Sequence, residues 1–180
     1  MRININYVLD SSCEKWSRNI NNELSKLSTN EINFSSGLFR PHITLLMGEI
    51  NEADFVKIKQ IVEEFKSNSL NKKINFDKPY IKGPYIFTDV KDSTTFKKDC
   101  DNLLLALNGL IVPHKHLISN GNPPHITLGY IKNTEEISDY VNSINDIPSS
   151  ILQNINVSKT GIHGTVICDG ISTSHTISAN

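Results

Sequence analysis

The sequence predicts an α+β fold of two similar lobes made by internal duplication, with antiparallel sheets around a central cleft and helices on the outer faces. Residues 41–45 and 124–128 both read PHITL and lie 83 residues apart, a repeat that arises by chance in roughly one in a hundred such chains. The order strand, helix, motif strand, helix, strand also occurs twice. We therefore expect one domain over residues 1–180, with pseudo-symmetric halves of about 1–82 and 83–180 and one PHITL strand in each lobe.

Alternation of apolar and polar residues predicts the strands that accompany the two motif strands. The expected strands lie over residues 2–9, 73–81 and 84–90, and in the tail from Ile151 onward. A turn at Gly83–Pro84 should join the middle two strands. In the tail, residues 168–171 have the composition of a two-residue hairpin turn.

Apolar residues at helical spacing predict four helices, two in each half. The expected N-caps are Ser11 or Ser12, Asn51, Ser93 and Asn133. The apolar stripes of the first and third helices correspond at the same offset as the motifs: Ile20, Leu24 and Leu27 match Leu103, Leu107 and Leu110. Polar loops over residues 29–39 and 112–123 should connect these two helices to the PHITL strands.

The two motifs bring chemically useful side chains to one face of the sheet. In an extended strand, residues i and i+2 point to the same side. His42 and Thr44 should therefore share a face, as should His125 and Thr127, while the isoleucine and leucine of each motif point into a core. If the two strands lie side by side, two imidazoles and two hydroxyls line one concave surface.

This combination suits the cleavage of a phosphodiester by general acid–base catalysis. The unperturbed pKa of imidazole lies close to neutral pH, so one ring can accept a proton while the other donates one. Threonine hydroxyls can donate hydrogen bonds to the phosphate between the rings. We expect His42 and His125 to be catalytic and Thr44 and Thr127 to bind phosphate, and we expect neither a metal ion nor a cofactor.

Two His-x-Thr-Leu motifs about eighty residues apart on a duplicated α+β frame resemble the 2H phosphoesterase superfamily. This superfamily includes the bacterial 2′-5′ RNA ligase-like proteins and the cyclic phosphodiesterases. The resemblance implies that His42 and His125 are catalytic and that Thr44 and Thr127 bind phosphate. Members of the family open 2′,3′-cyclic phosphates or cut 2′-5′ linkages, and viral members destroy nucleotide alarm signals.

The first functional hypothesis is therefore a metal-independent phosphodiesterase acting on RNA ends or oligonucleotides, at a 2′,3′-cyclic phosphate or a 2′-5′ linkage. The second is a hydrolase of cyclic-oligonucleotide or 2′-5′-oligoadenylate immune signals. The third is a non-catalytic module that binds phosphorylated nucleotides. The motifs do not distinguish these three, nor which histidine is the acid and which the base.

Other residues near the motifs have two interpretations each. Arg40 could bind a phosphate or be an exposed charge, and Tyr130 could stack on a base or pack in the core. The His114-Lys115-His116 cluster could hold zinc, but a solvated basic loop in which His116 contacts substrate phosphate is the favoured interpretation. His163 and His175 are predicted to be structural residues of the tail strands.

Composition and charge limit the class of partner. The formal net charge is −1, so the chain lacks the positive field that recruits duplex DNA. No apolar stretch is long enough to span a membrane. Cys13, Cys100 and Cys168 are widely spaced, which is typical of reduced thiols in a cytosolic protein. We expect a cytoplasmic monomer whose partner is a nucleotide or oligonucleotide substrate, and which binds neither duplex DNA nor a membrane.

Overall fold

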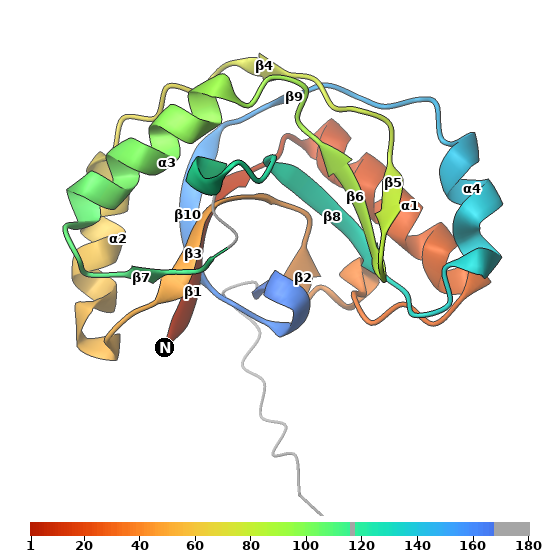
Figure 1. Ribbon diagram of the computed structural model, residues 1–180, viewed down its shortest axis with the longest axis horizontal. Helices are drawn as coiled ribbons and strands as arrows, with labels where there is room; N and C mark the ends of the chain where they lie inside the picture. Colours follow the sequence, from red (N-terminus) through yellow and green to blue (C-terminus); the bar gives the residue numbers. More distant parts are fainter. Residues whose placement is uncertain (116–117, 168–180) are drawn as a thin grey trace, which may run out of the picture.

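A curved antiparallel sheet forms the inside of an arch, and the helices cover its outside (Figure 1). The computed structural model describes residues 1–115 and 118–167. The helices are α1 (Ser11–Leu27), α2 (Phe55–Glu64), α3 (Thr94–Leu107) and α4 (Ser138–Ser143). The strands are β1 (Arg2–Val8), β2 (Phe39–Arg40), β3 (Ile43–Glu49), β4 (Lys73–Ile74), β5 (Tyr80–Lys82), β6 (Tyr85–Asp89), β7 (Val112–Pro113), β8 (His125–Tyr130), β9 (Ser150–Ile151), β10 (Asn154–Lys159) and β11 (Val166–Ile167). The predicted α+β class with antiparallel pairing is confirmed.

The main sheet has the strand order β10-β1-β3-β8-β6-β5, and β7 pairs with one end of β3. Two small sheets, β2 with β11 and β4 with β9, lie apart from it. The two PHITL strands β3 and β8 are neighbours at the centre, joined where Ile43 pairs with Ile126. The two lobes therefore share one continuous sheet.

Strands from the two halves of the sequence are exchanged between the lobes. The lobe that contains β1 and β3 from the first half is completed by β10 from the second half. The lobe that contains β6 and β8 is completed by β5, which comes from the end of the first half. Neither half of the chain contains all the strands of a lobe.

The helices are exchanged in the same way, as Figure 1 shows with α2 and α3 over one end of the arch and α1 and α4 over the other. α3 packs against β1: the rings of Tyr7 and Phe96 meet edge-to-face at 5.3 Å, and Tyr7 donates a hydrogen bond of 2.8 Å to Asp99. α1 packs against β8, where the Asn21 amide donates to the Leu128 carbonyl at 2.8 Å. None of the described helices combines the length and apolar character needed to span a bilayer.

The motif strands bury their apolar side chains, although Leu45, which the alternation places on the core face, also borders the cavity. Ile43, Leu45, Ile126 and Leu128 are at most 1% exposed and belong to the continuous core. α1 approaches β8 closely because the strand has glycine at position 129: a Cβ there would lie 3.1 Å from Leu24 Cδ1. This packing leaves the histidines and threonines for the concave face.

Two of the predicted helix caps, those of α1 and α4, are wrong. The cap of α1 is Asp10, which accepts from Cys13 N at 3.0 Å and from Ile151 N at 2.7 Å. A carboxylate that also ties down a distant strand thus takes the place predicted for Ser11 or Ser12. Asn133 instead donates to Glu136, and α4 begins after a 3₁₀ turn at Glu135–Ile137.

The other two predicted caps lie at or near a helix start. Asn51 accepts from Ala53 N, as a cap should, but the first turn is a 3₁₀ helix, Glu52–Asp54, that leads into α2. Ser93 occupies the N-cap position of α3 without making a side-chain capping bond. Asp92 supplies that bond instead, accepting from Thr94 N at 3.0 Å.

The prediction of one strand over residues 73–81 is also wrong. The segment divides into β4 and β5, which belong to different sheets, and Pro79 between them has no N–H to donate to a ladder. The expected loop over residues 112–123 contains β7 and a 3₁₀ turn, Ile118–Asn120. The hairpin turn predicted at 168–171 lies outside the described residues, as does His175.

The exchange of strands and helices predicts that neither sequence half folds alone. Residues 1–82 and 83–180, expressed separately, should show no cooperative unfolding in urea by circular dichroism, because each lacks the strands and helices that cover its core. Mixing the two fragments should restore a cooperative transition. A fragment with its own sharp unfolding transition would contradict the importance of the exchange.

Candidate active site

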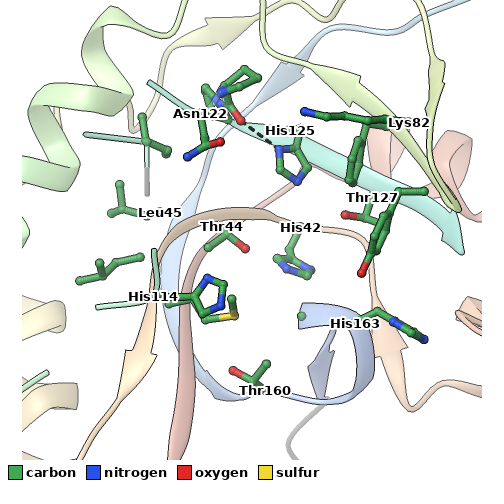
Figure 2. Close-up of a pocket in the computed structure, with 18 of the residues that line it drawn as sticks. His42, Thr44, Leu45, Lys82, His114, Asn122, His125, Thr127, Thr160 and His163 are labelled. Atoms are coloured by element: carbon green, nitrogen blue, oxygen red, sulfur yellow. Dashed lines mark hydrogen bonds between the residues drawn. The ribbon is translucent and has the colours of Figure 1, made fainter. Parts of the chain in front are cut away.

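The central strand pair brings the four motif side chains into one cavity. Because Ile43 pairs with Ile126 in antiparallel register, one step along the strands places His42 beside Thr127 and Thr44 beside His125. All four line a cavity of about 730 Å³ on the concave face, and Figure 2 shows them gathered around the same space. A pseudo-twofold axis through the isoleucine pair relates the two motifs.

Both imidazoles are held in the same orientation by their own chain. His42 Nδ1 lies 3.0 Å from the Arg40 carbonyl oxygen, and His125 Nδ1 lies 2.9 Å from that of Pro123. A carbonyl can only accept, so Nδ1 carries the hydrogen and Nε2 is left for the reaction. A proline precedes each histidine and keeps the residue before it extended, which helps to aim the carbonyl at the ring.

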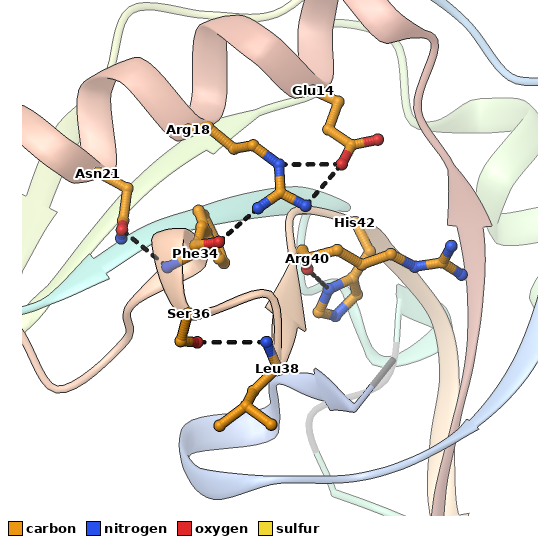
Figure 3. A network of polar contacts seen from close by, with 8 residues as sticks. All are labelled: Glu14, Arg18, Asn21, Phe34, Ser36, Leu38, Arg40 and His42. Carbon is orange, nitrogen blue, oxygen red and sulfur yellow. Dashed lines mark hydrogen bonds and ion pairs between the residues drawn. The ribbon is translucent and has the colours of Figure 1, made fainter. Parts of the chain in front are cut away.

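The loop before the first motif is anchored to α1 (Figure 3). Arg18 is bound to Glu14 at 2.7 Å and donates to the Phe34 carbonyl, and Asn21 accepts from Phe34 N at 3.0 Å. These bonds fix a 3₁₀ turn at Phe34–Ser36 just before β2. The chain therefore enters the first motif from a rigid support.

Arg40 lies beside the motif, but its side chain is not among those that line the cavity. Figure 3 shows the guanidinium pointing away from the His42 ring. It lies against the Asn156 amide, whose oxygen, when turned toward it, accepts at 2.6 Å. In this arrangement Arg40 contributes its backbone carbonyl to the site, and a phosphate contact by its side chain stays a prediction.

Asn4 is a site residue that the sequence analysis missed. Its amide nitrogen lies 2.9 Å from Thr44 Oγ1, 3.3 Å from the Gly164 carbonyl oxygen and 3.4 Å from His42 Nε2. The alternation of residues along β1 could have indicated this role, because it places Asn4 on the face opposite the core residues Ile3 and Ile5. That face is the one on which the histidines stand.

Aromatic rings form one side of the cavity next to His125. The Phe87 ring lies 4.4 Å from the His125 ring and stacks on Tyr85 at 5.3 Å. Behind them, Tyr130 contacts Tyr85 at 4.9 Å and stacks on His163 at 3.6 Å. We call Tyr85, Phe87 and His163 the aromatic wall, because these three line the cavity, whereas Tyr130 packs behind them.

His163 therefore has a different position from the structural one that the sequence predicts. It lines the cavity and lies 2.8 Å from a carboxylate oxygen of Glu31, which also pairs with Lys132 at 2.9 Å. Its φ of 51° is left-handed, an uncommon conformation for a residue other than glycine. His114 also lines the cavity, and His116 lies outside the described residues.

Burial lowers the pKa of both motif histidines. Desolvation disfavours the imidazolium of His42 and lowers its pKa to about 4, with the nearby charges of Arg40 and His125 acting in the same direction. Desolvation also lowers the pKa of His125, but here the Asp89 carboxylate opposes the effect while Lys82 adds to it. Without an anion in the cavity, both rings are neutral at pH 7.

Within the described residues, no group of three or more histidine, cysteine, aspartate or glutamate side chains is arranged to hold a metal ion. The described cavity is lined by imidazoles, threonine hydroxyls, an asparagine amide, tyrosine side chains and the cationic side chains of Arg2 and Lys82. Such a set can accept and donate protons and bind an anion.

The sequence matches no protein-family model and no curated protein. The fold, however, is shared with solved structures. The PDE domain of MHV ns2 superimposes with a TM-score of 0.61 at 14% identity, covering 89% of this chain and 99% of that domain. The protein TT0787 of Thermus thermophilus gives a TM-score of 0.52 at 14% identity, covering 93% of this chain and 94% of the other. This chain therefore shares the fold of these two structures, which agrees with the predicted α+β class.

The lowered pKa of His42 predicts that the protein loses stability in mild acid. In the unfolded chain His42 binds a proton near pH 6.5, whereas in the folded protein it does so only near pH 4. Stability should therefore be complete above pH 6.5 and fall between pH 6.5 and 4. The loss should be on the order of 1 to 2 kcal/mol, because water in the cavity mouth screens part of the effect.

Urea unfolding at pH 7 and pH 4.5 measures this loss, and His42→Gln, which cannot titrate, should lose less than the wild type over the same interval. Equal losses in the two proteins would show that His42 is not the group responsible.

Proposed function

We propose that the protein is a metal-independent phosphodiesterase that acts on RNA ends or oligonucleotides, with His42 and His125 as proton carriers and Thr44 and Thr127 as phosphate ligands. The observation that carries this proposal is the symmetric quartet in one cavity, in which both rings are tethered through Nδ1 to a carbonyl two residues earlier. A packing role would not require two rings that line one cavity and are held alike through Nδ1. The shared fold with a PDE domain supports the same class of reaction.

The proposed reaction moves two protons around one phosphorus. For a 2′,3′-cyclic phosphate, one Nε2 takes a proton from water while the water oxygen attacks phosphorus. The bond from phosphorus to one ribose oxygen breaks, and the second histidine gives its Nε2 proton to that oxygen. The product is a phosphomonoester, and exchange with solvent resets both rings. The threonine hydroxyls donate to the phosphate oxygens on which charge builds up.

We assign the base to His42 and the acid to His125 in this direction. The amide nitrogen of Asn4 faces His42 Nε2 at 3.4 Å, which favours a ring that holds a lone pair there. On the other strand, Asp89 is the register partner of His125, and its charge favours the imidazolium. The negative phosphate bound between the rings raises the pKa of the acid further. The roles exchange in the reverse reaction.

The cavity suits a nucleotide better than a bare phosphate. Its volume of about 730 Å³ is within the range of small-molecule sites, and the aromatic wall offers ring faces on which a base can stack. Lys82 lines the same side and supplies one positive charge. Turnover assays with a panel of 2′,3′-cyclic mononucleotides, 2′-5′-linked dinucleotides and cyclic dinucleotides would identify the substrate within this class.

Single substitution of either histidine should abolish most of the turnover found in that panel. General acid–base assistance is typically worth about 10² to 10⁴ per group, so His42→Ala and His125→Ala should each lower kcat by that order. The double variant should lose less than the product of the two effects, because both groups act on one transition state. Assays in EDTA should give the same wild-type rate.

Two results would contradict the proposed chemistry: a folded double variant that keeps the wild-type rate, or activity that EDTA removes and zinc restores. Tight nucleotide binding by a wild-type protein that turns over none of the panel would instead indicate a binding module.

Removing a threonine hydroxyl should lower the rate without changing its pH dependence. Thr44→Val and Thr127→Val keep the shape of the side chain and delete one phosphate donor, a loss worth about 10- to 10³-fold in kcat/KM by analogy with oxyanion ligands. The pH profile of kcat/KM should be bell-shaped, because one ring must be neutral and the other protonated, and it should keep its width in these variants because both proton carriers remain. Thr44→Ser and Thr127→Ser retain the hydroxyl and are the matched controls. Serine variants as slow as the valine variants would rule out the hydroxyl as the group that acts.

A further inference from the structure

We propose that Asn4 is the positioning residue of the site: its side-chain amide directs the Thr44 hydroxyl toward the phosphate and keeps His42 Nε2 available as a proton acceptor. This inference rests on the proposed phosphodiesterase function and names a residue on which that function depends. Asn4 is fully buried in β1 (0% exposed), yet it packs against the polar side of the sheet.

The surroundings of Asn4 determine which way its amide faces. The Gly164 carbonyl, at 3.3 Å, can only accept a hydrogen bond, so the amide nitrogen must lie on that side. The same nitrogen is 2.9 Å from Thr44 Oγ1, the shortest of its three contacts. One amide hydrogen therefore goes to Thr44, and the other lies between the Gly164 oxygen and His42 Nε2.

This orientation fixes the roles of the two groups that Asn4 contacts. A threonine hydroxyl has one hydrogen, and when its oxygen accepts from Asn4 that hydrogen is left to donate to a phosphate oxygen in the cavity. A hydrogen directed at His42 Nε2 is attractive only while that nitrogen holds a lone pair, so protonation of the ring is disfavoured. The first effect prepares the site for an anion, and the second keeps the His42 ring unprotonated before the reaction, as a base must be.

Asparagine at position 4 lowers the stability of the fold, because one polar atom of its side chain has no hydrogen-bond partner among the described residues. That atom is Oδ1, which is buried, and an unpaired buried oxygen lowers stability. Leucine has a similar shape and would remove the unpaired oxygen. Stability alone therefore does not explain asparagine at this position, whereas the contacts of its nitrogen do.

The register position of the second lobe that corresponds to Asn4 carries no amide. Asn4 pairs with Met47, and the residue that pairs with the corresponding position of β8, Tyr130, is Tyr85. Thr127 has Phe87 as its register partner. The pseudo-symmetry is thus broken at this position, where the His42 side has an amide and the His125 side an aromatic ring.

The test is Asn4→Leu, with Asn6→Leu as the matched control. Asn6 lies on the same strand and face, is also 0% exposed with an unpartnered Oδ1, and donates to the Asn4 backbone carbonyl. Asn4→Leu should lower kcat about 10- to 100-fold, the usual cost of removing a residue that orients a ligand group. It should also weaken binding of inorganic phosphate and raise the pKa of His42 measured by NMR. Asn6→Leu should leave these three quantities close to their wild-type values.

The melting temperature separates positioning from a structural role. For Asn4→Leu it should stay within about 4 °C of wild type, because Thr44 and Gly164 face a cavity that water can enter. A large drop in melting temperature with unchanged kcat, phosphate affinity and His42 pKa would overturn the proposal.

A second variant covers the case in which Asn4→Leu does not fold. Asn4→Asp has the same shape but only accepts, so it should draw the Thr44 hydrogen away from the phosphate, lower kcat at least as much, and raise the pKa of His42 further. Wild-type-like kcat and His42 titration in this variant would overturn the proposal. If the wild type turns over no phosphodiester, the proposed function fails, while phosphate binding and the His42 titration still decide the role of Asn4.

Discussion

The pairing of β3 with β8 is the constraint on which the site depends. Ile43 and Ile126 meet at the centre of the sheet, and both are fully buried beneath the helices. Because side chains alternate along a strand, burying these two residues sends the flanking histidine and threonine of each motif to the opposite face. A slip of one residue in either strand would put a histidine in the core and an isoleucine in the cavity. Core packing and the geometry of the site are therefore set by the same register.

The exchange of elements between the lobes makes this central pair rigid. β10 closes the lobe of β3, and β5 closes the lobe of β8, so each half of the sequence is bound on both sides of the cleft. Asp99 of α3 adds a buried polar connection, accepting from Tyr7 of β1 at 2.8 Å and from Ser67 Oγ at 2.6 Å. Burial opposes its ionisation, but these bonds and that from the Asn68 backbone hold the pKa of the carboxyl low. A scaffold of this kind keeps catalytic groups in place without a substrate.

The two sides of the site differ although the motifs are identical. An amide from β1 faces His42, whereas an aromatic ring and the Asp89 carboxylate lie near His125. Burial lowers the pKa of both rings, and what separates them is the charge and hydrogen bonding supplied by the neighbouring strands. A duplicated motif can therefore provide two proton carriers with opposite tasks, since the strands beside the motif have diverged.

Local patterns in the sequence determined the fold class, the motif strands and the shared face of His42, Thr44, His125 and Thr127. These features depend on the alternation of residues within a strand or the spacing along a helix, which short stretches of sequence contain. Only the tertiary structure decided the exchange of strands and helices, the direction of the Arg40 side chain, the contacts of Asn4 with Thr44 and His42, and the presence of Phe87 and His163 in the cavity. The bond from Asn4 to the Gly164 carbonyl joins residues 160 positions apart, and the carboxylate that caps α1 also binds a strand 141 positions away. Such partners are chosen by which surfaces pack together, and no local periodicity encodes that choice.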